Sequence, residues 1–106
     1  MTAEVVAALR DELDDRADDA GVSRVESPGA VEYRAGSRVV AVAEPAALSF
    51  RLGPQVARAA AATSDASPSA RGPEWVRFAP RVLDQFALDR ATSWFDLAVR
   101  LAVPPQ

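Results

Sequence analysis

The chain has 106 residues, 49% of them apolar and 25% charged, which is typical of one globular domain rather than a disordered segment. It contains neither histidine nor cysteine, which excludes Ser-His-Asp and Cys-His nucleophiles, disulfide bonds and zinc bound by histidine or thiolate. The formal net charge is -3 and all twelve basic residues are arginine. We therefore predict one domain over residues 1–106 without catalytic His or Cys.

Charge and hydropathy along the chain bear on location and partners. No apolar run is long enough to predict a membrane-spanning helix, and the acidic N-terminal stretch does not have the pattern of a secretory signal. We therefore expect a cytoplasmic protein with no membrane partner. Residues 1–26 hold eight acidic residues against three arginines, whereas residues 27–106 hold seven against nine, so an acidic first element precedes a mildly basic remainder.

The first predicted element is an amphipathic helix over residues 4–20, because its apolar side chains recur at helical spacing. Asp11, Asp15 and Asp18 lie one turn apart on it, and in principle they could hold a divalent cation. Helical carboxylates alone rarely supply the six oxygens that such an ion needs, and no turn glycine of a calcium loop is present. A solvated acidic face is therefore the favoured interpretation, and we predict no metal site.

A hairpin and a third strand are predicted next. Residues 22–29 read as a connector. Residues 30–35 alternate between apolar and polar side chains, and the turn at 36–37 leads into 38–43, which is apolar on both faces as in a central strand. Residues 46–52 alternate again and predict a third strand.

The second half of the chain predicts two helices and one strand. Pro54 suits the first position of a short helix that runs to about residue 62, and residues 63–73 are a loop by composition. Residues 74–78 predict a fourth strand, and residues 88–103 predict a final helix that Pro104–Pro105 ends. The expected fold class is α+β: a four-stranded antiparallel sheet with helices on one face, in the order α-β-β-β-α-β-α.

Alternation along the strands predicts which side chains leave the core. The expected core-facing set is Val31, Tyr33, Leu48, Phe50, Leu52, Val76 and Phe78. The opposite, outward face then carries Glu32, Arg34, Ser49, Arg51, Trp75 and Arg77. Arg34, Arg51, Trp75 and Arg77 are the candidate binding residues, since tryptophan and arginine are typical anchors of protein interfaces.

This outward face has three possible interpretations, two functional and one structural. It predicts a homodimer or protein-partner interface, or alternatively a stacking platform for nucleic acid or another anionic ligand. The third interpretation is structural: Trp75 covers the sheet and stacks on Arg77 or Arg51. Binding of nucleic acid depends on neutralised phosphates, so the acidic net charge disfavours it.

Catalysis is disfavoured as well. The five glycines are scattered singly, so neither a phosphate-binding loop nor a G-x-G-x-x-G motif is present, and no serine has a G-x-S-x-G context. A small-molecule enzyme that uses a carboxylate pair among Glu32, Glu44 and Glu74 stays open as a further alternative. We predict a non-enzymatic binding module with no catalytic residue and no cofactor.

The order of elements resembles one family. The segments VEYRAGSRVVAVAEPAALSFRL, GPEWVRFAP and DRATSWFDLAVRLA are similar to the small bacterial MmcQ/YjbR-like proteins and related actinobacterial domains of unknown function. The resemblance spans roughly residues 5–102 and rests on hydrophobic pattern and on Trp75–Val76. It implies an α+β fold with an antiparallel sheet and a family label of DNA binding. This chain departs from the family in its acidic balance and in having Arg51 where other members are lysine-rich.

Overall fold

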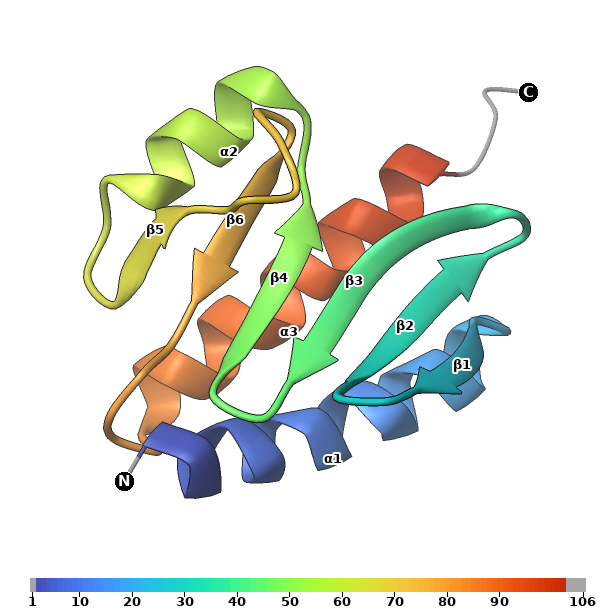
Figure 1. Ribbon diagram of the computed structural model, residues 1–106, viewed down its shortest axis with the longest axis horizontal. Helices are drawn as coiled ribbons and strands as arrows, with labels where there is room; N and C mark the ends of the chain where they lie inside the picture. Colours follow the sequence, from blue (N-terminus) through green and yellow to red (C-terminus); the bar gives the residue numbers. More distant parts are fainter. Residues whose placement is uncertain (1, 103–106) are drawn as a thin grey trace.

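The computed structural model describes residues 2–102, which form three helices and one six-stranded antiparallel sheet (Figure 1). In chain order the elements are α1 (Thr2–Ala20), β1 (Ser23–Ser27), β2 (Ala30–Ala35), β3 (Arg38–Glu44), β4 (Ala47–Arg51), α2 (Pro54–Ala61), β5 (Ala66–Pro68), β6 (Trp75–Phe78) and α3 (Gln85–Ala102). The expected α+β class and antiparallel sheet are confirmed. No helix of the described part is long and apolar enough to cross a membrane.

The strand order in the sheet is β1-β2-β3-β4-β6-β5. The first four strands form a meander, and β6 pairs antiparallel with both β4 and β5. Strands β4 and β5 therefore run in the same direction and are joined through α2, which packs on β5 and β6. This crossover brings α2 and the loop after β5 to one end of the sheet, far from β1 (Figure 1).

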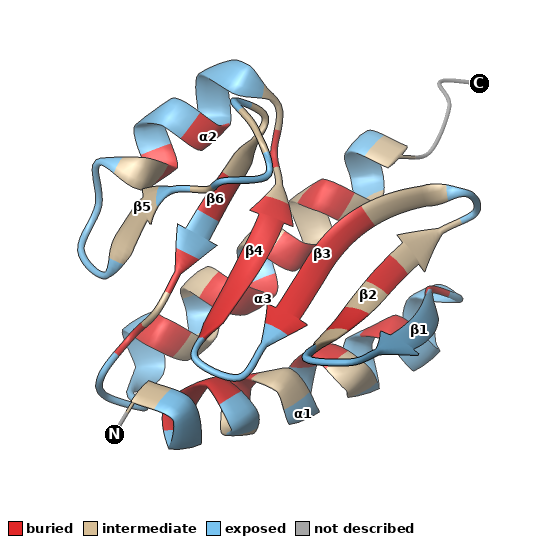
Figure 2. Ribbon diagram, viewed as in Figure 1, coloured by how far each residue is buried: buried red, intermediate tan, exposed pale blue. Residues whose placement is uncertain are grey.

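The core lies between the sheet and two long helices, α1 and α3. In Figure 1, α3 passes behind β3 and β4, and α1 runs along the lower side of the sheet. Helix α1 contributes Leu9 and Leu13 and helix α3 contributes Phe95, all fully buried. The ring of Phe95 meets that of Tyr33 edge to face, with 5.5 Å between the ring centres. Burial is concentrated in β3, β4 and the inner helix faces, whereas β1 is exposed (Figure 2).

The prediction of four strands is wrong, because the sheet has six. The predicted connector 22–29 contains β1, all five residues of which are exposed. The predicted loop 63–73 contains β5, only three residues long and ending in Pro68. Neither strand buries a face, so neither shows the apolar alternation by which strands are recognised in a sequence.

The final helix begins at Gln85, three residues earlier than predicted. The carboxylate of Asp84 accepts a hydrogen bond of 2.9 Å from the backbone N–H of Ala87, so Asp84 acts as the N-cap that satisfies a free donor of the first turn. The predicted end of this helix at Val103 and the stop at Pro104–Pro105 lie outside the described residues.

Candidate functional site

The sheet has the two faces that strand alternation predicts. All seven residues of the predicted core-facing set belong to the buried core. On the opposite face Glu32, Val42, Ser49 and Arg77 follow one another across four strands, each directly paired with the next. Arg51 lies opposite Trp75 in the ladder between β4 and β6.

The middle of the outward face is not an open apolar surface. Val42 is 0% exposed and Ser49 is 2% exposed, although both alternate away from the helix-covered core. Strand β3 also contains a bulge: Tyr33 pairs with Ala41 and Arg34 pairs with Val39, which leaves Val40 as the extra residue. The bulge turns Val40 into the core. The doubly apolar strand is therefore buried on both sides within this chain.

The arginines predicted to share this face have different surroundings. Arg34 donates to Glu32 of the same strand at 2.6 Å, and Arg51 donates to Glu74 at 2.9 Å. Arg77 is exposed and has no carboxylate partner within residues 2–102. The strand order separates Arg34 from β6 by two strands. The structure thus brings Arg51, Trp75 and Arg77 together and leaves Arg34 apart.

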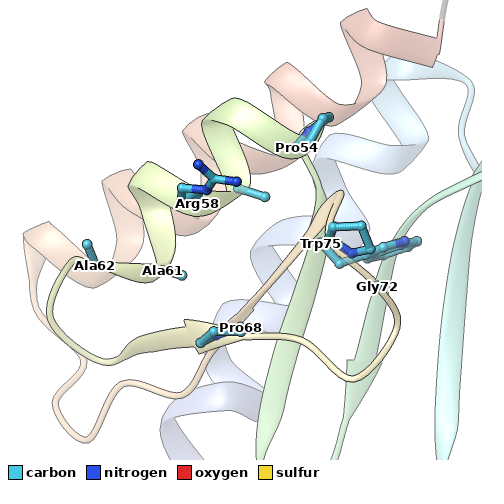
Figure 3. Close-up of a pocket in the computed structure, with 9 residues that line it drawn as sticks. Pro54, Arg58, Ala61, Ala62, Pro68, Gly72 and Trp75 are labelled. Carbon is cyan, nitrogen blue, oxygen red and sulfur yellow. The ribbon is translucent and has the colours of Figure 1, made fainter.

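Trp75 forms one wall of a groove of about 410 Å³ between α2 and the loop that joins β5 to β6. Figure 3 shows Pro54 and Arg58 on α2, and Pro68, Gly72 and Trp75 on the segment from β5 to β6. We call this cavity the Trp75 groove; it is lined by Pro54, Ala57, Arg58, Ala61, Ala62, Pro68, Gly72, Pro73 and Trp75. Its lining is largely alanine, proline and one indole, and it contains no carboxylate.

Backbone geometry explains why the groove has this shape. Gly53 has a φ of 83°, a conformation that L side chains rarely adopt, and it turns the chain from β4 into α2. The carbonyl of Glu74 accepts hydrogen bonds from the N–H groups of Leu52 at 2.8 Å and Gly53 at 3.1 Å. These bonds hold the start of α2 against the loop that precedes Trp75, so the two walls of the groove are positioned by β4 and β6.

Two arginines, Arg58 and Arg71, accompany Trp75 at the groove. The guanidinium of Arg71 lies 5.8 Å from the centre of the indole ring, which is cation–π distance. The stacking partner of Trp75 is therefore the loop residue Arg71, and not Arg77 or Arg51 as the structural interpretation predicts. Arg58 and Arg71 form no ion pair in the described part of the chain. The groove is therefore an apolar, locally positive site in a protein of net charge -3.

The remaining candidates form no comparable site. Between Thr2 and Ala102, no group of three or more acidic side chains is placed to hold a metal ion, and this includes the acidic face of α1. Of the three glutamates considered for catalysis, Glu32 and Glu74 form ion pairs with arginines and Glu44 is exposed. None of the three lines the Trp75 groove. Trp94 packs in the core against Phe50 and Phe78.

One side-chain hydrogen bond joins the sheet to α1. The hydroxyl of Tyr33 donates to the carboxylate of Asp14 at 2.6 Å. Burial, together with this hydrogen bond, raises the pKa of the Tyr33 phenol well above its usual value. The contact lies on the helix side of the sheet and is remote from the Trp75 groove, so we assign it to stability.

A second exposed apolar surface lies in the first turn of α3 and in the residues just before it. Val82 is 63% exposed, Leu83 53% and Phe86 79%. These side chains follow one another closely in the sequence, but they do not line one cavity: Val82 and Phe86 border one hollow and Leu83 borders another. The Trp75 groove is therefore the better defined candidate.

Sequence reasoning found Trp75 and Arg77 but missed Arg58, Arg71 and the proline walls. The available signal was the close spacing of Pro68, Arg71, Pro73 and Trp75 in one loop. No family model, curated protein or solved structure matches this chain. The resemblance to MmcQ/YjbR-like proteins therefore stays a prediction.

Proposed function

We propose that this chain is a non-enzymatic binding module whose Trp75 groove receives an extended segment of a partner protein. The observation that carries the proposal is the groove itself, about 410 Å³ in volume, with walls of proline, alanine and tryptophan and no carboxylate. Its volume lies in the range of about 300–1,000 Å³ that ligand sites occupy. Tryptophan is among the residues that contribute most to binding at protein interfaces.

The chemistry of the groove indicates what the partner segment carries. The flat faces of Trp75, Pro68 and Pro73 suit an extended chain with small or apolar side chains. Arg58 and Arg71 present planar guanidinium groups without carboxylate partners in the described residues, and such groups bind carboxylates in bidentate geometry. We therefore expect a segment that combines apolar residues with at least one Asp or Glu.

A planar anionic ligand, including single-stranded nucleic acid, is the second candidate function. Arg71 stacked on Trp75 favours it, and so does Arg77, which has no carboxylate partner among residues 2–102, because nucleic-acid sites combine stacking surfaces with cations. The net negative charge of the chain disfavours nucleic-acid binding, since residues 1–26 hold eight acidic residues against three arginines. A protein segment needs only one local charge contact, whereas a nucleic-acid strand needs several neutralised phosphates.

Selection from a peptide library tests the proposal. The purified chain is used to select from a library of random ten-residue peptides, and the enriched peptides are titrated against Trp75→Ala, Arg58→Gln and the control Arg100→Gln, an exposed arginine on α3. Loss of an interface anchor costs about 2 kcal/mol or more, so we expect Trp75→Ala to weaken binding by about 30-fold. Arg58→Gln should weaken acidic peptides selectively, and Arg100→Gln should change nothing.

The same assay separates the two candidate functions. An oligo(dT) strand is titrated in parallel at two salt concentrations, since nucleic-acid affinity falls steeply with salt. Tight, salt-dependent binding of oligo(dT) that needs Trp75 would favour the anionic ligand. Peptides whose affinity is the same for wild type and Trp75→Ala would refute the groove as the binding site.

A further inference from the structure

Strand β1 forms one edge of the sheet, at the opposite end from the Trp75 groove. It pairs with β2 on one side only, and all of its five residues are exposed (Figure 2). The backbone N–H and C=O groups along an open edge are a template for another strand. Proteins usually blunt such edges with charged side chains, proline or a very short strand. Ser23–Ser27 contains no proline, and its two charges, Arg24 and Glu26, are of opposite sign, so they need not repel a second copy of the strand.

The hairpin turn determines which backbone groups of β1 point away from the sheet. Ser27 pairs with Ala30 across a turn of only two residues, and in such a hairpin the flanking pair exchanges both backbone hydrogen bonds. Bonded and non-bonded pairs alternate along an antiparallel ladder. Ser27, Val25 and Ser23 therefore direct their backbone groups toward β2, and Arg24 and Glu26 direct theirs toward the open edge.

The sequence of β1, Ser-Arg-Val-Glu-Ser, is complementary to itself when read in the reverse direction. If two copies of the strand pair antiparallel about Val25, Ser23 faces Ser27, Arg24 faces Glu26, and Val25 faces Val25 of the other copy. Arg24 and Glu26 are then hydrogen-bonded partners whose opposite charges also attract. All five residues of each strand are used.

Charge excludes the neighbouring registers. Backbone groups match only when the two-fold axis lies at residue 24, 25 or 26, because Arg24 and Glu26 must pair with one another or with themselves. An axis at residue 24 places two arginines opposite each other, and an axis at residue 26 places two glutamates opposite each other; like charges in that position are destabilising. The arrangement about Val25 alone pairs opposite charges.

We propose that two copies of this chain associate edge to edge through β1, antiparallel and centred on Val25, so that the two sheets become one. This inference does not depend on the function proposed for the Trp75 groove. The pair is isologous, as two-fold interfaces are. It leaves the groove of each copy open at the outer end of the joined sheet.

Charges from α1 face the same strand and limit the strength of association. Arg24 lies 3.5 Å from a carboxylate oxygen of Asp14 and 3.4 Å from one of Asp18, and Arg10 lies 3.9 Å from Glu26. Each copy thus brings two cations and three anions to the edge. A five-residue strand pair also buries less than the roughly 1,200 Å² of a standard interface. We expect a weak dimer that needs high protein concentration.

A disulfide trap tests the register directly, because the native chain contains no cysteine. In the proposed pair the two Val25 side chains face each other in a non-bonded pair, at the Cα separation of about 4.5 Å that a disulfide accepts. Val25→Cys should therefore form a covalent dimer under mild oxidation. The matched control is Ser23→Cys, whose copies lie four residues apart along the ladder, about 14 Å, and should stay monomeric.

Charge reversal provides an independent measurement by sedimentation velocity at high concentration. Arg24→Glu creates two Glu–Glu contacts and Glu26→Arg creates two Arg–Arg contacts, so each change should lower the association constant about tenfold or more. The double variant Arg24→Glu/Glu26→Arg restores opposite charges between copies and should restore the dimer. It does not restore the contacts of residue 24 with Asp14 and Asp18, so recovery reports on the contact between copies.

The outcomes decide the proposal. A wild-type chain that stays monomeric and a Val25→Cys variant that does not cross-link would overturn it. A dimer that the reversals leave unchanged, or that Trp75→Ala abolishes, would assign self-association to another surface and would also overturn it. Failure of peptide binding to the groove would leave this result unaffected, so the two proposals fail separately. Circular dichroism of each variant confirms that the chain is folded.

Discussion

The hydrogen bond from Tyr33 to Asp14 joins the second strand of the sheet to α1, and its removal tests how the layers are held together. Tyr33 is 0% exposed and its ring packs edge to face on Phe95. Tyr33→Phe removes only the hydroxyl, because phenylalanine keeps the ring, its burial and the contact with Phe95. The perturbation therefore isolates one donor to a carboxylate at 2.6 Å.

The structure bounds the size of the effect. A hydrogen bond to a charged group contributes about 1.5–3 kcal/mol to stability. Asp14 keeps part of its stabilisation in the variant, because its side chain is 28% exposed and lies 3.5 Å from Arg24. We therefore expect Tyr33→Phe to lower the free energy of unfolding by about 1–2 kcal/mol, which corresponds to a fall in Tm of about 4–16 °C for a domain of this size.

Urea unfolding followed by tryptophan fluorescence measures the difference, and a double-mutant cycle assigns it. The cycle uses Tyr33→Phe, Asp14→Ala and the double variant. If the pair interacts as described, the effects of the two single changes should not add, with a coupling of about 1 kcal/mol or more. A loss below about 0.5 kcal/mol for Tyr33→Phe, or strict additivity, would refute the assignment of this contact as a stabilising bond.

The remaining predictions use the same unfolding assay. Because the folded state raises the pKa of Tyr33, the contribution of this group to stability should be constant below about pH 10 and should be lost as the pH rises further, since the unfolded phenol ionises there first; Tyr33→Phe should remove this alkaline loss. Gly53→Ala should cost about 1–2 kcal/mol, because φ is 83° at that position; a neutral change would show that the turn into α2 tolerates a side chain. Phe95→Ala should cost about 3–5 kcal/mol, since the ring is fully buried, and a smaller loss would mean that the core closes around the cavity. Phe86→Ser should stay within about 0.5 kcal/mol of wild type, because Phe86 is 79% exposed, and a large loss would place it in a packed environment.

The sequence predicted elements wherever burial leaves a periodic pattern. Leu9 and Leu13 recur at helical spacing because one side of α1 lies on the sheet. Phe50 and Val76 alternate with polar residues because one side of each strand meets the core. Such patterns are local, so the core-facing set of residues could be read without knowing which strands are neighbours.

The two edge strands could not be predicted in the same way. Val25 and its neighbours in β1 are exposed on both faces, and β5 is too short to alternate, so neither leaves a hydrophobic pattern. Their strand conformation is determined by backbone hydrogen bonds to β2 and β6, and such bonds do not require a particular pattern of side chains.

The candidate site shows the same division. The sequence by itself determined that Trp75 and Arg77 point away from Val76 and Phe78, because alternation is a property of one strand. Only the tertiary structure decided that Arg51 would be neutralised by Glu74, that Arg58 would line the groove and that Arg71 would border the indole. These residues come from β4, α2 and two parts of one loop. The crossover from β4 to β5 and the insertion of β6 between them bring these segments together, and that pairing is a property of the whole chain.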